Sequence, residues 1–373
     1  MYVTNTIAFI LLMLPTIGFA QTNDWVKRSK ETWPPIAMIN EVWFRNGERY
    51  VHPSFDYVAT GFLIDTGSDT VAATVKHALW VAKTKSMRTV SVPDLARWIM
   101  HPKGNLKDSV VIDKLINADT TEILSGPQST ITQRDWLVFT TKYRSTNIQP
   151  LKARYTAVKR GERIYFTGCP YSSSTCTTQE ATVLYTEGDR IIFTAPENLN
   201  VGGYSGSPLI DQSGFLIGIL GGSSFDKRNG QAALYGISTR YLSDVLSKKS
   251  QLNVPLIPIE SVIQPMIHTQ GINASIRKLD AMLSDSISYF TYTFSMENIS
   301  NIGDELAKTG KIKSAIKFYA LNRKHFVTPY TYLKLAQAHA LQGDKKKSRS
   351  VYKEILEKWP DNKEAREALE KLK

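Results

Sequence analysis

Cysteine is scarce in this sequence: 373 residues contain only two, Cys169 and Cys176. So few cysteines exclude the disulfide-stapled frameworks of small secreted domains. Their stretch offers too few ligands for a metal site, and no cofactor is expected. The two residues are either free thiols or, in an oxidising compartment, one disulfide that closes a short loop.

Dense basic segments are also lacking, although the formal net charge is +12. The lysines are spread along the chain, and the densest run, at 345–347, stands at an expected helix turn with acidic neighbours on both sides. No nucleic-acid-binding motif accompanies it. The basic charge is therefore interpreted as solvated helix surface, and nucleic acid is not expected as a partner.

No apolar run of membrane-spanning length follows residue 20. Before it, 7–14 is apolar and is followed by the small-residue end Gly18-Phe19-Ala20. This pattern predicts a signal peptide at 1–20, cleaved after Ala20, and an exported protein that is periplasmic or secreted, with no stable membrane span after cleavage. The first six residues carry no Lys or Arg, so an uncleaved anchor is the alternative, although the run is short for a span of about 20 residues.

The remaining chain of about 350 residues exceeds what one core usually holds, which predicts two domains. After an N-terminal extension at 21–34, the stretch 35–248 contains short β-rich runs separated by turn residues, the pattern of a sandwich or barrel. Helical patterns are expected in this half only around 92–100 and at 238–248. The β-rich runs lie at 36–44, 58–64, 136–140, 163–167, 190–194 and 214–220.

The chain changes character after Leu252, where three prolines punctuate a stretch without clear periodicity. This stretch, 249–273, is interpreted as a linker. Beyond it, 274–373 has helical spacing and a repeat that resembles the 34-residue tetratricopeptide pattern. The repeat predicts an all-α helical-repeat domain that binds a protein or peptide ligand, with a generic helical hairpin as the alternative. The pattern recurs after 33 residues, so that one set of positions matches another: 299, 302, 303, 306, 310, 315 and 319 correspond to 332, 335, 336, 339, 343, 348 and 352.

The run 202–211, Gly-Gly-Tyr-Ser-Gly-Ser-Pro-Leu-Ile-Asp, says most about function. It places Ser205 in a glycine-rich turn before an apolar strand. Such a turn aims backbone N–H groups into the space beside the hydroxyl, which suits a nucleophile. Because Ser, Gly and Pro also gather in ordinary surface loops, the interpretation depends on finding a base and a group that orients it.

The candidate base is His77, which ends a strand-like run where the chain enters a turn or short helix. A strand end fixes the backbone of a histidine and leaves its ring exposed. A lone histidine is usually a polar surface residue, but the expected hairpin with 60–64 would display this one. The other histidines before Ser205 in the β-rich half, His52 and His101, each precede a proline in a turn.

The candidate orienting carboxylate is Asp135, at the edge of an apolar run. A buried aspartate needs a partner to offset its desolvation; Asp113 is the less favoured competitor. The motif Asp65-Thr-Gly also resembles the active-site motif of aspartic peptidases, but such enzymes need two facing carboxylates, so this chain would have to dimerise. Asp65 is better interpreted as part of the hairpin turn before the His77 strand.

Five segments carry a family resemblance: Gly61-Phe-Leu-Ile, Val75-Lys-His77-Ala-Leu, Asp135-Trp-Leu-Val, Gly203-Tyr-Ser205-Gly-Ser-Pro and Gly218-Ile-Leu-Gly-Gly222. Their order, His then Asp then Ser, is that of chymotrypsin. Over about 35–248 the chain resembles a trypsin-like serine peptidase of the compact bacterial or Deg type. The resemblance implies a mainly β fold with two six-stranded antiparallel barrels, and an endopeptidase with polypeptide substrates.

The resemblance also implies a role for each candidate residue. His77 would be the general base and then acid, Asp135 would orient it, and Ser205 would attack the carbonyl. The N–H groups of Gly203 and Ser205 would form the oxyanion hole. Leu199, with the separate group Gly221, Gly222 and Ser223, would line the primary pocket, which predicts small or apolar side chains before the cleaved bond.

Several features depart from that family. Lys76 is expected to put a charge beside the catalytic edge, and Ser207 stands where a second glycine is usual. The long spacing from His77 to Asp135 predicts an insertion at 91–130 on the first barrel. No Ile-Val-Gly-Gly activation sequence follows the signal peptide, so activation by a new N-terminus is not expected. The rival class is a catalytically silent peptidase-fold adaptor, against which the presence of all three residue types argues.

Overall fold

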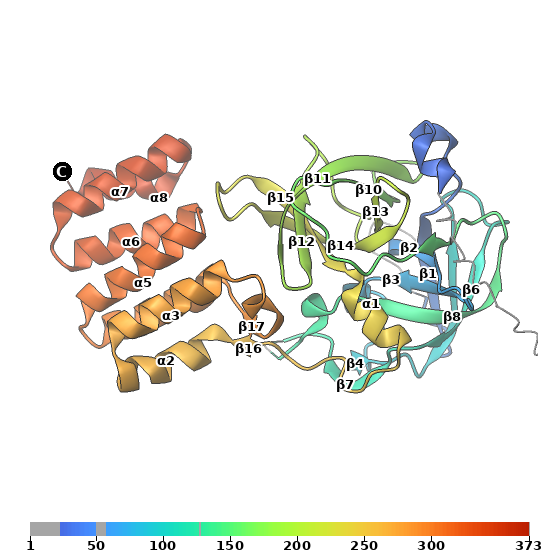
Figure 1. Cartoon of the computed structure of the whole chain (residues 1–373), viewed down its shortest axis with the longest axis horizontal. Helices are drawn as coiled ribbons and strands as arrows, with labels where there is room; N and C mark the ends of the chain where they lie inside the picture. Colours follow the sequence, from blue (N-terminus) through green and yellow to red (C-terminus); the bar gives the residue numbers. More distant parts are fainter. Residues whose placement is uncertain (1–22, 50–56, 127, 373) are drawn as a thin grey trace, which may run out of the picture.

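The computed structural model describes residues 23–49, 57–126 and 128–372, which form two β-barrels and a helical tail (Figure 1). The signal peptide predicted at 1–20 lies outside the described residues, as does His52. The N-terminal extension contains two short 3₁₀ helices, Asp24–Lys27 and Lys30–Thr32. In the described part of the chain, no helix is both long and apolar enough to cross a membrane.

Six antiparallel strands form the first barrel in the order β1-β5-β6-β8-β3-β2, and pairing of β1 with β2 closes it. The short strand β9 (Leu151–Lys152) adds to β2 in parallel. Beside the barrel, β4 (Thr89–Val90) pairs with β7 (Asp119–Ile123). The barrel strands are β1 (Met38–Phe44), β2 (Val58–Asp65), β3 (Thr70–Thr74), β5 (Leu95–His101), β6 (Val110–Leu115) and β8 (Leu137–Arg144).

Two expectations for the first barrel are wrong. The segment around 92–100, expected to be helical, contains strand β5 instead. The stretch 91–130, expected to be an insertion on the barrel, supplies β5 and β6 to the barrel itself, and β7 pairs with β4 beside it. Trp98 and Met100 stand two positions apart and are both buried, as side chains on one face of a strand are. Pairing of β5 with β1 therefore outweighs the local helical pattern.

The second barrel is closed by six antiparallel strands in the order β10-β11-β12-β15-β14-β13. The predicted pair of six-stranded antiparallel barrels is thus confirmed. The helix expected at 238–248 is also confirmed as α1 (Thr239–Leu246), with Ser238 as its N-cap. The strands are β10 (Arg163–Gly168), β11 (Thr177–Glu187), β12 (Arg190–Thr194), β13 (Pro208–Asp211), β14 (Leu216–Phe225) and β15 (Ala232–Ser238).

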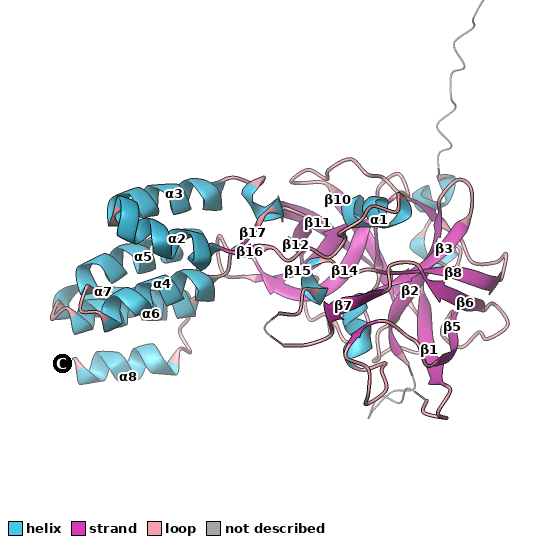
Figure 2. Cartoon of the chain, turned by 90° about the horizontal axis from the view of Figure 1, so that it is seen from below, coloured by secondary structure: helices cyan, strands magenta, loops and turns pink. Residues whose placement is uncertain are grey.

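Antiparallel helices make up the tail, which lies to one side of the barrels in both views (Figures 1 and 2). Helices α4 and α6 begin 33 positions apart, as do α5 and α7, which is the period of the sequence repeat. The helices share one apolar core. They are α2 (Ile259–Gln270), α3 (Ile272–Ser284), α4 (Met296–Lys308), α5 (Ile312–His325), α6 (Pro329–Leu341), α7 (Lys345–Lys358) and α8 (Lys363–Lys371).

The helical region begins earlier than expected, because α2 occupies part of the stretch 249–273 that the sequence assigned to a linker. Pro265 lies inside α2 and removes one backbone hydrogen bond there. Ile259 and Ile263 of the same helix are fully buried in the tail core. Burial of these two side chains offsets the cost of the proline, and the linker proper is shortened to the residues before α2.

The tail is docked on the barrels rather than tethered loosely. The backbone N–H of Val327 donates to the carbonyl of Lys227 in the β14–β15 loop at 2.7 Å. The Lys227 ammonium also donates to the Tyr289 hydroxyl at 2.9 Å. On the first barrel, Gln133 accepts a hydrogen bond from the N–H of Leu256 at 3.1 Å. The linker before the tail therefore contacts the loop that leads to Asp135.

Candidate active site

Ser205 lies in the turn that leads into β13, and glycines give this turn its shape. Gly203 and Gly206 have positive φ angles of 93° and 86°, which glycine adopts without steric cost. A Cβ on Gly206 would stand 2.0 Å from the carbonyl oxygen of Thr60 in the first barrel. Gly206 thus lets the serine turn of the second barrel lie directly against β2.

His77 lies in a 3₁₀ helix, Lys76–Trp80, directly after β3. Asp135 contacts it twice: one carboxylate oxygen lies 2.6 Å from His77 Nδ1, and the other accepts the backbone N–H of His77 at 2.9 Å. The aspartate side chain is fully buried, whereas the histidine ring is 18% exposed. The strand end thus presents His77 while the carboxylate fixes both its backbone and its ring.

The electrostatics of this pair favour a protonated ring. Burial by itself lowers the pKa of His77, but the charge of Asp135 and its hydrogen bond outweigh burial and raise that pKa above its ordinary value. With Nδ1 bonded to the carboxylate, Nε2 is the nitrogen left to exchange a proton with a substrate. The pair has the chemistry of a general base held by a buried anion.

The turn around Ser205 also contains two backbone N–H groups that make no hydrogen bond within the described residues. Within the described residues, neither the N–H of Gly203 nor that of Ser205 has an acceptor in the protein. By contrast, the N–H of Tyr204 donates to the Val201 carbonyl at 3.0 Å, and that of Gly206 to the Leu220 carbonyl at 2.9 Å. Two free N–H groups beside a serine hydroxyl are the donors that an oxyanion needs.

The two halves of the site meet across the barrels, although His77 and Ser205 share no hydrogen bond in the described structure. The N–H of Thr60 donates to the Ser205 carbonyl at 2.7 Å, which brings the serine turn against β2 beside the strand that ends before His77. Ser205 Oγ lies 3.5 Å from the Gly221 carbonyl. Catalytic hydrogen bonds are often long or poorly aligned before a substrate binds.

The competing residues have other roles. Asp65 accepts a hydrogen bond from the N–H of Gly67 at 2.8 Å within the β2–β3 hairpin, so the predicted hairpin turn is confirmed. Asp113 contacts Thr140 at 3.3 Å. His101 Nδ1 lies 2.9 Å from the carbonyl of the proline that follows it. In the described residues none of these three joins the pair of His77 and Asp135.

The expectation for Lys76 is wrong: its side chain is fully buried and points into the protein rather than toward the catalytic edge. Its ammonium pairs with Glu122 at 2.8 Å and donates to Asn253 at 2.7 Å. It also donates to the Tyr241 hydroxyl at 3.1 Å. These partners come from three distant segments, so the sequence around Lys76 carried no signal of them.

Two of the residues expected to line the substrate pocket, Gly221 and Gly222, lie beside a side chain that the sequence did not single out, Tyr235. A Cβ on Gly221 would stand 2.3 Å from the Tyr235 ring, which also lies near Gly222. Burial, together with the charge of Asp135, raises the pKa of Tyr235 to about 12. Leu199 packs against the core of the second barrel, and Ser223 is exposed.

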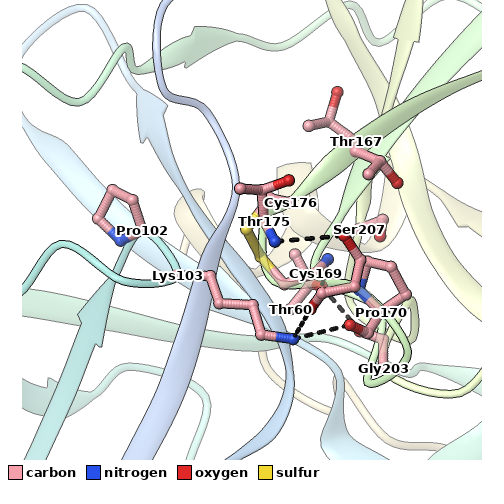
Figure 3. The surroundings of a disulfide bond; sticks show 12 residues. Thr60, Pro102, Lys103, Thr167, Cys169, Pro170, Thr175, Cys176, Gly203 and Ser207 are labelled. Atoms are coloured by element: carbon pink, nitrogen blue, oxygen red, sulfur yellow. Dashed lines mark hydrogen bonds between the residues drawn. A yellow bond between two sulfur atoms is a disulfide. The ribbon is translucent and has the colours of Figure 1, made fainter.

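The two cysteines form a disulfide in the structure, which closes the loop between β10 and β11 (Figure 3). This loop lies against the serine turn, because the N–H of Tyr171 donates to the Gly202 carbonyl at 3.0 Å. A Cβ on Gly203 would stand 2.6 Å from the Cys169 carbonyl oxygen. The second alternative left open by the sequence, one short disulfide loop, is the one observed.

Comparison with known proteins gives a family for the barrels. Residues 59–219 match the family model of the trypsin-like peptidase domain. This match confirms, for these residues, the resemblance to trypsin-like serine peptidases that the sequence motifs predicted. No match is found among curated proteins.

Three solved structures are similar to the chain. The active form of the protease Rv3671c from M. tuberculosis is 14% identical (TM-score 0.40), and the match covers 66% of this chain and 95% of that one. The serine endoprotease from Yersinia pestis is 17% identical (TM-score 0.38), and the match covers 61% of this chain and 65% of that one. The HtrA-type protease AlgW with a tripeptide is 16% identical (TM-score 0.39), and the match covers 62% of this chain and 64% of that one. The chain thus spans less than two thirds of the last two proteins.

Proposed function

We propose that the protein is a serine endopeptidase in which His77, Asp135 and Ser205 form a catalytic triad. The observation that carries the proposal is the buried Asp135 carboxylate, which binds both the ring and the backbone N–H of His77 at 2.6 and 2.9 Å. Such an arrangement makes a histidine a proton acceptor of fixed orientation. The match of residues 59–219 to the trypsin-like peptidase domain supports the same assignment.

The proposed reaction follows from these positions. His77 Nε2 takes the proton of Ser205 Oγ as that oxygen forms a bond to the carbonyl carbon of the scissile peptide. The N–H groups of Gly203 and Ser205 then bind the oxyanion. His77 gives its proton to the departing amine as the C–N bond breaks, leaving an acyl-enzyme. A water molecule, deprotonated by the same ring, hydrolyses the ester and restores the serine.

The test is covalent labelling with a fluorophosphonate probe. Wild-type protein should be labelled stoichiometrically at Ser205, and Ser205→Ala should not be labelled. Ser213→Ala is the matched control, because Ser213 is exposed in the turn after β13, away from the site, and should label like wild type. Wild-type protein that folds but resists the probe would instead support the silent adaptor.

We propose a primary pocket for small or apolar side chains, lined by Leu199 and by Gly221, Gly222 and Ser223. None of these residues carries a charge, and the Tyr235 ring stands over Gly221. A peptide library should therefore be cleaved after alanine, valine or similar residues. Cleavage confined to positions after Lys or Arg would contradict this assignment.

For the tail we propose a tetratricopeptide-like domain that binds a protein or peptide. A cavity of about 550 Å³ opens between α4, α5 and α6, lined by residues that include Asp304, Lys334 and Leu341. Full-length Ser205→Ala protein should enrich peptides from a random display library. Leu341 is 72% exposed, so Leu341→Asp should abolish their binding without unfolding the helices. Lys358→Ala, outside this cavity, is the control, and equal binding by all variants would argue against the site.

We further propose that the protein is exported and is periplasmic or secreted. The apolar segment and small-residue end at 1–20 support this, and the disulfide of Cys169 and Cys176 fits an oxidising compartment. The exported protein should begin at Gln21 when its N-terminus is sequenced. Full-length protein retained in the cytoplasm would contradict export.

A further inference from the structure

Thr60 is a buried threonine that joins three parts of the molecule. It lies in β2 and its side chain has no exposed surface. Its hydroxyl donates to the Gly203 carbonyl at 2.8 Å and accepts the N–H of Cys169 at 2.9 Å. Figure 3 shows Thr60 between these two residues. One hydroxyl of the first barrel therefore connects the serine turn with the disulfide loop.

A hydroxyl is required to make this connection. Threonine and serine can donate one hydrogen bond and accept another at the same atom. Valine has the shape of threonine but makes neither bond, and would leave the Gly203 carbonyl and the Cys169 N–H unpaired in a buried place. The position of Thr60 is itself held, because its carbonyl accepts the Thr74 hydroxyl at 2.7 Å.

The contacts of Thr60 and Tyr171 fix the two peptide planes on either side of Gly203. In a trans peptide the N–H points opposite to the preceding carbonyl. The Gly202 carbonyl is held by the Tyr171 N–H at 3.0 Å, which sets the direction of the Gly203 N–H. The Gly203 carbonyl is held by Thr60, which sets the next plane. Glycine at positive φ is the residue with most freedom to rotate here, so both contacts are needed.

The second donor of the turn is held in a similar way. The Tyr204 carbonyl accepts the Ser207 hydroxyl at 2.6 Å and the Ser207 N–H at 2.9 Å. This fixes the plane that contains the N–H of Ser205. The N–H of Thr60 binds the Ser205 carbonyl on the following plane at 2.7 Å. Thr60 is thus the residue that touches both 203 and 205.

We propose that Thr60 is a positioning residue for the oxyanion hole, acting through the Gly203 carbonyl and coupling that hole to the disulfide loop. This inference rests on the proposed peptidase function. Thr60 contacts no reacting atom itself. Its hydroxyl holds the peptide plane after Gly203, while Tyr171 holds the plane before it. Loss of the hydroxyl frees Gly203 to rotate and so misdirects its N–H, which weakens binding of the transition state more than binding of the substrate.

The test compares Thr60→Val with Thr60→Ser on a peptide substrate. Loss of one direct oxyanion donor lowers kcat roughly 100- to 1,000-fold, so loss of a residue that aims such a donor is expected to lower kcat about 10- to 100-fold. KM should change by less than about threefold, and Thr60→Ser should restore kcat to near wild type. A peptide aldehyde, whose adduct places an oxyanion in the hole, should lose affinity for Thr60→Val in proportion to kcat.

A matched control separates positioning from a structural role. Thr239 is also buried, and its hydroxyl donates to the Arg154 carbonyl at 2.6 Å, away from the serine turn. Thr239→Val should lower the unfolding temperature without changing kcat or aldehyde affinity. An equal loss of kcat in both valine variants would overturn the proposal. So would wild-type kcat in Thr60→Val, or failure of Thr60→Ser to restore it.

Two further results keep the outcome decisive. If Thr60→Val does not fold, Thr60→Ala removes the same hydroxyl without placing a methyl group against polar atoms, and the same kcat criterion applies to it. If wild-type protein is not labelled by the fluorophosphonate, the proposed peptidase function itself has failed. If wild-type protein is labelled and cleaves the substrate, and Thr60→Val and Thr60→Ala have the kcat of wild type, only the role of Thr60 is refuted.

Discussion

The two barrels supply their parts of the candidate site in different ways. The first barrel provides His77 and Asp135, which are joined to each other by two hydrogen bonds within that barrel. The second barrel provides Ser205 on a glycine turn, whose carbonyls are held from outside by Thr60 and by the disulfide loop. The pair of His77 and Asp135 is thus complete in one barrel, whereas the turn that carries the proposed oxyanion donors is held both within its own barrel and by contact with the other.

This difference means that the two parts should fail independently. A change within the first barrel at Asp135 should alter proton transfer and the pKa of His77. A change at the serine turn should alter transition-state binding and leave the titration of His77 as it was. Four measurements test this separation, from the largest expected effect to the smallest.

Asp135→Asn should have the largest effect. The asparagine amide would donate to His77 Nδ1 and leave the wrong nitrogen protonated, and comparable triads lose about 10,000-fold in kcat from this change. Steady-state kinetics on a peptide substrate measures the loss. KM and the affinity for a peptide aldehyde, corrected for ring protonation, should change far less. A kcat within tenfold of wild type would show that Asp135 is not the orienting group.

Gly203→Ala should follow, with kcat lowered about 100- to 1,000-fold. The added Cβ would stand 2.6 Å from the Cys169 carbonyl oxygen, and φ is 93° at this residue, so the turn must shift. The pH dependence of the remaining activity should match that of wild type. Gly161→Ala is the control, since Gly161 also has a positive φ, 85°, but has open space around its Cβ position; it should retain full kcat.

Replacing both Cys169 and Cys176 by alanine should have a smaller effect. Loss of a cross-link that closes so short a loop should lower the free energy of unfolding by about 2 to 3 kcal/mol, measured by urea denaturation. The same loop holds the Gly202 carbonyl, so kcat should fall, but by less than in Gly203→Ala. An unchanged kcat would show that the loop does not need its cross-link to hold the turn.

The pH dependence of wild-type kcat/KM should show the smallest effect. His77 must be neutral to act as a base, and Asp135 raises its pKa despite burial, so activity should rise with pH through a midpoint above about 6.5. The same shift stabilises the fold when the ring is protonated: this contribution is full below about 6.5 and is lost as pH rises through the folded pKa. A midpoint below 6.5 would contradict the pairing with Asp135.

Much of the site could be predicted from the sequence because its residues stand next to recognisable local patterns. His77 follows the end of β3, Asp135 comes just before β8, and Ser205 lies between two glycines with positive φ. The hairpin turn at Asp65 was likewise readable, because one carboxylate and a glycine close it within the turn. In each case, the sequence pattern lies within a few residues of the side chain that it helped to identify.

The incorrect predictions concern residues whose contacts lie far away in the sequence. Strand β5 was mistaken for a helix because most of its length pairs with β1, which lies more than 50 residues away. Lys76 was expected at the catalytic edge because Glu122 and Asn253, which draw it inward, are invisible from its own neighbourhood. Tyr235 and Thr60 were missed for the same reason. Their roles come from Gly221 and Gly203, which face them across strands or barrels.

The sequence by itself determined which residue types occur in which order, and hence the resemblance to the trypsin-like peptidases, the barrel class and the three candidate catalytic residues. Only the tertiary structure decided how the serine turn is held. The Thr60 hydroxyl and the Gly203 carbonyl are 143 residues apart, and a hydrogen bond forms only when folding brings donor and acceptor within about 3 Å. The local sequence pattern can therefore identify the candidate nucleophile, whereas the hold on the turn around it depends in part on contacts between the barrels.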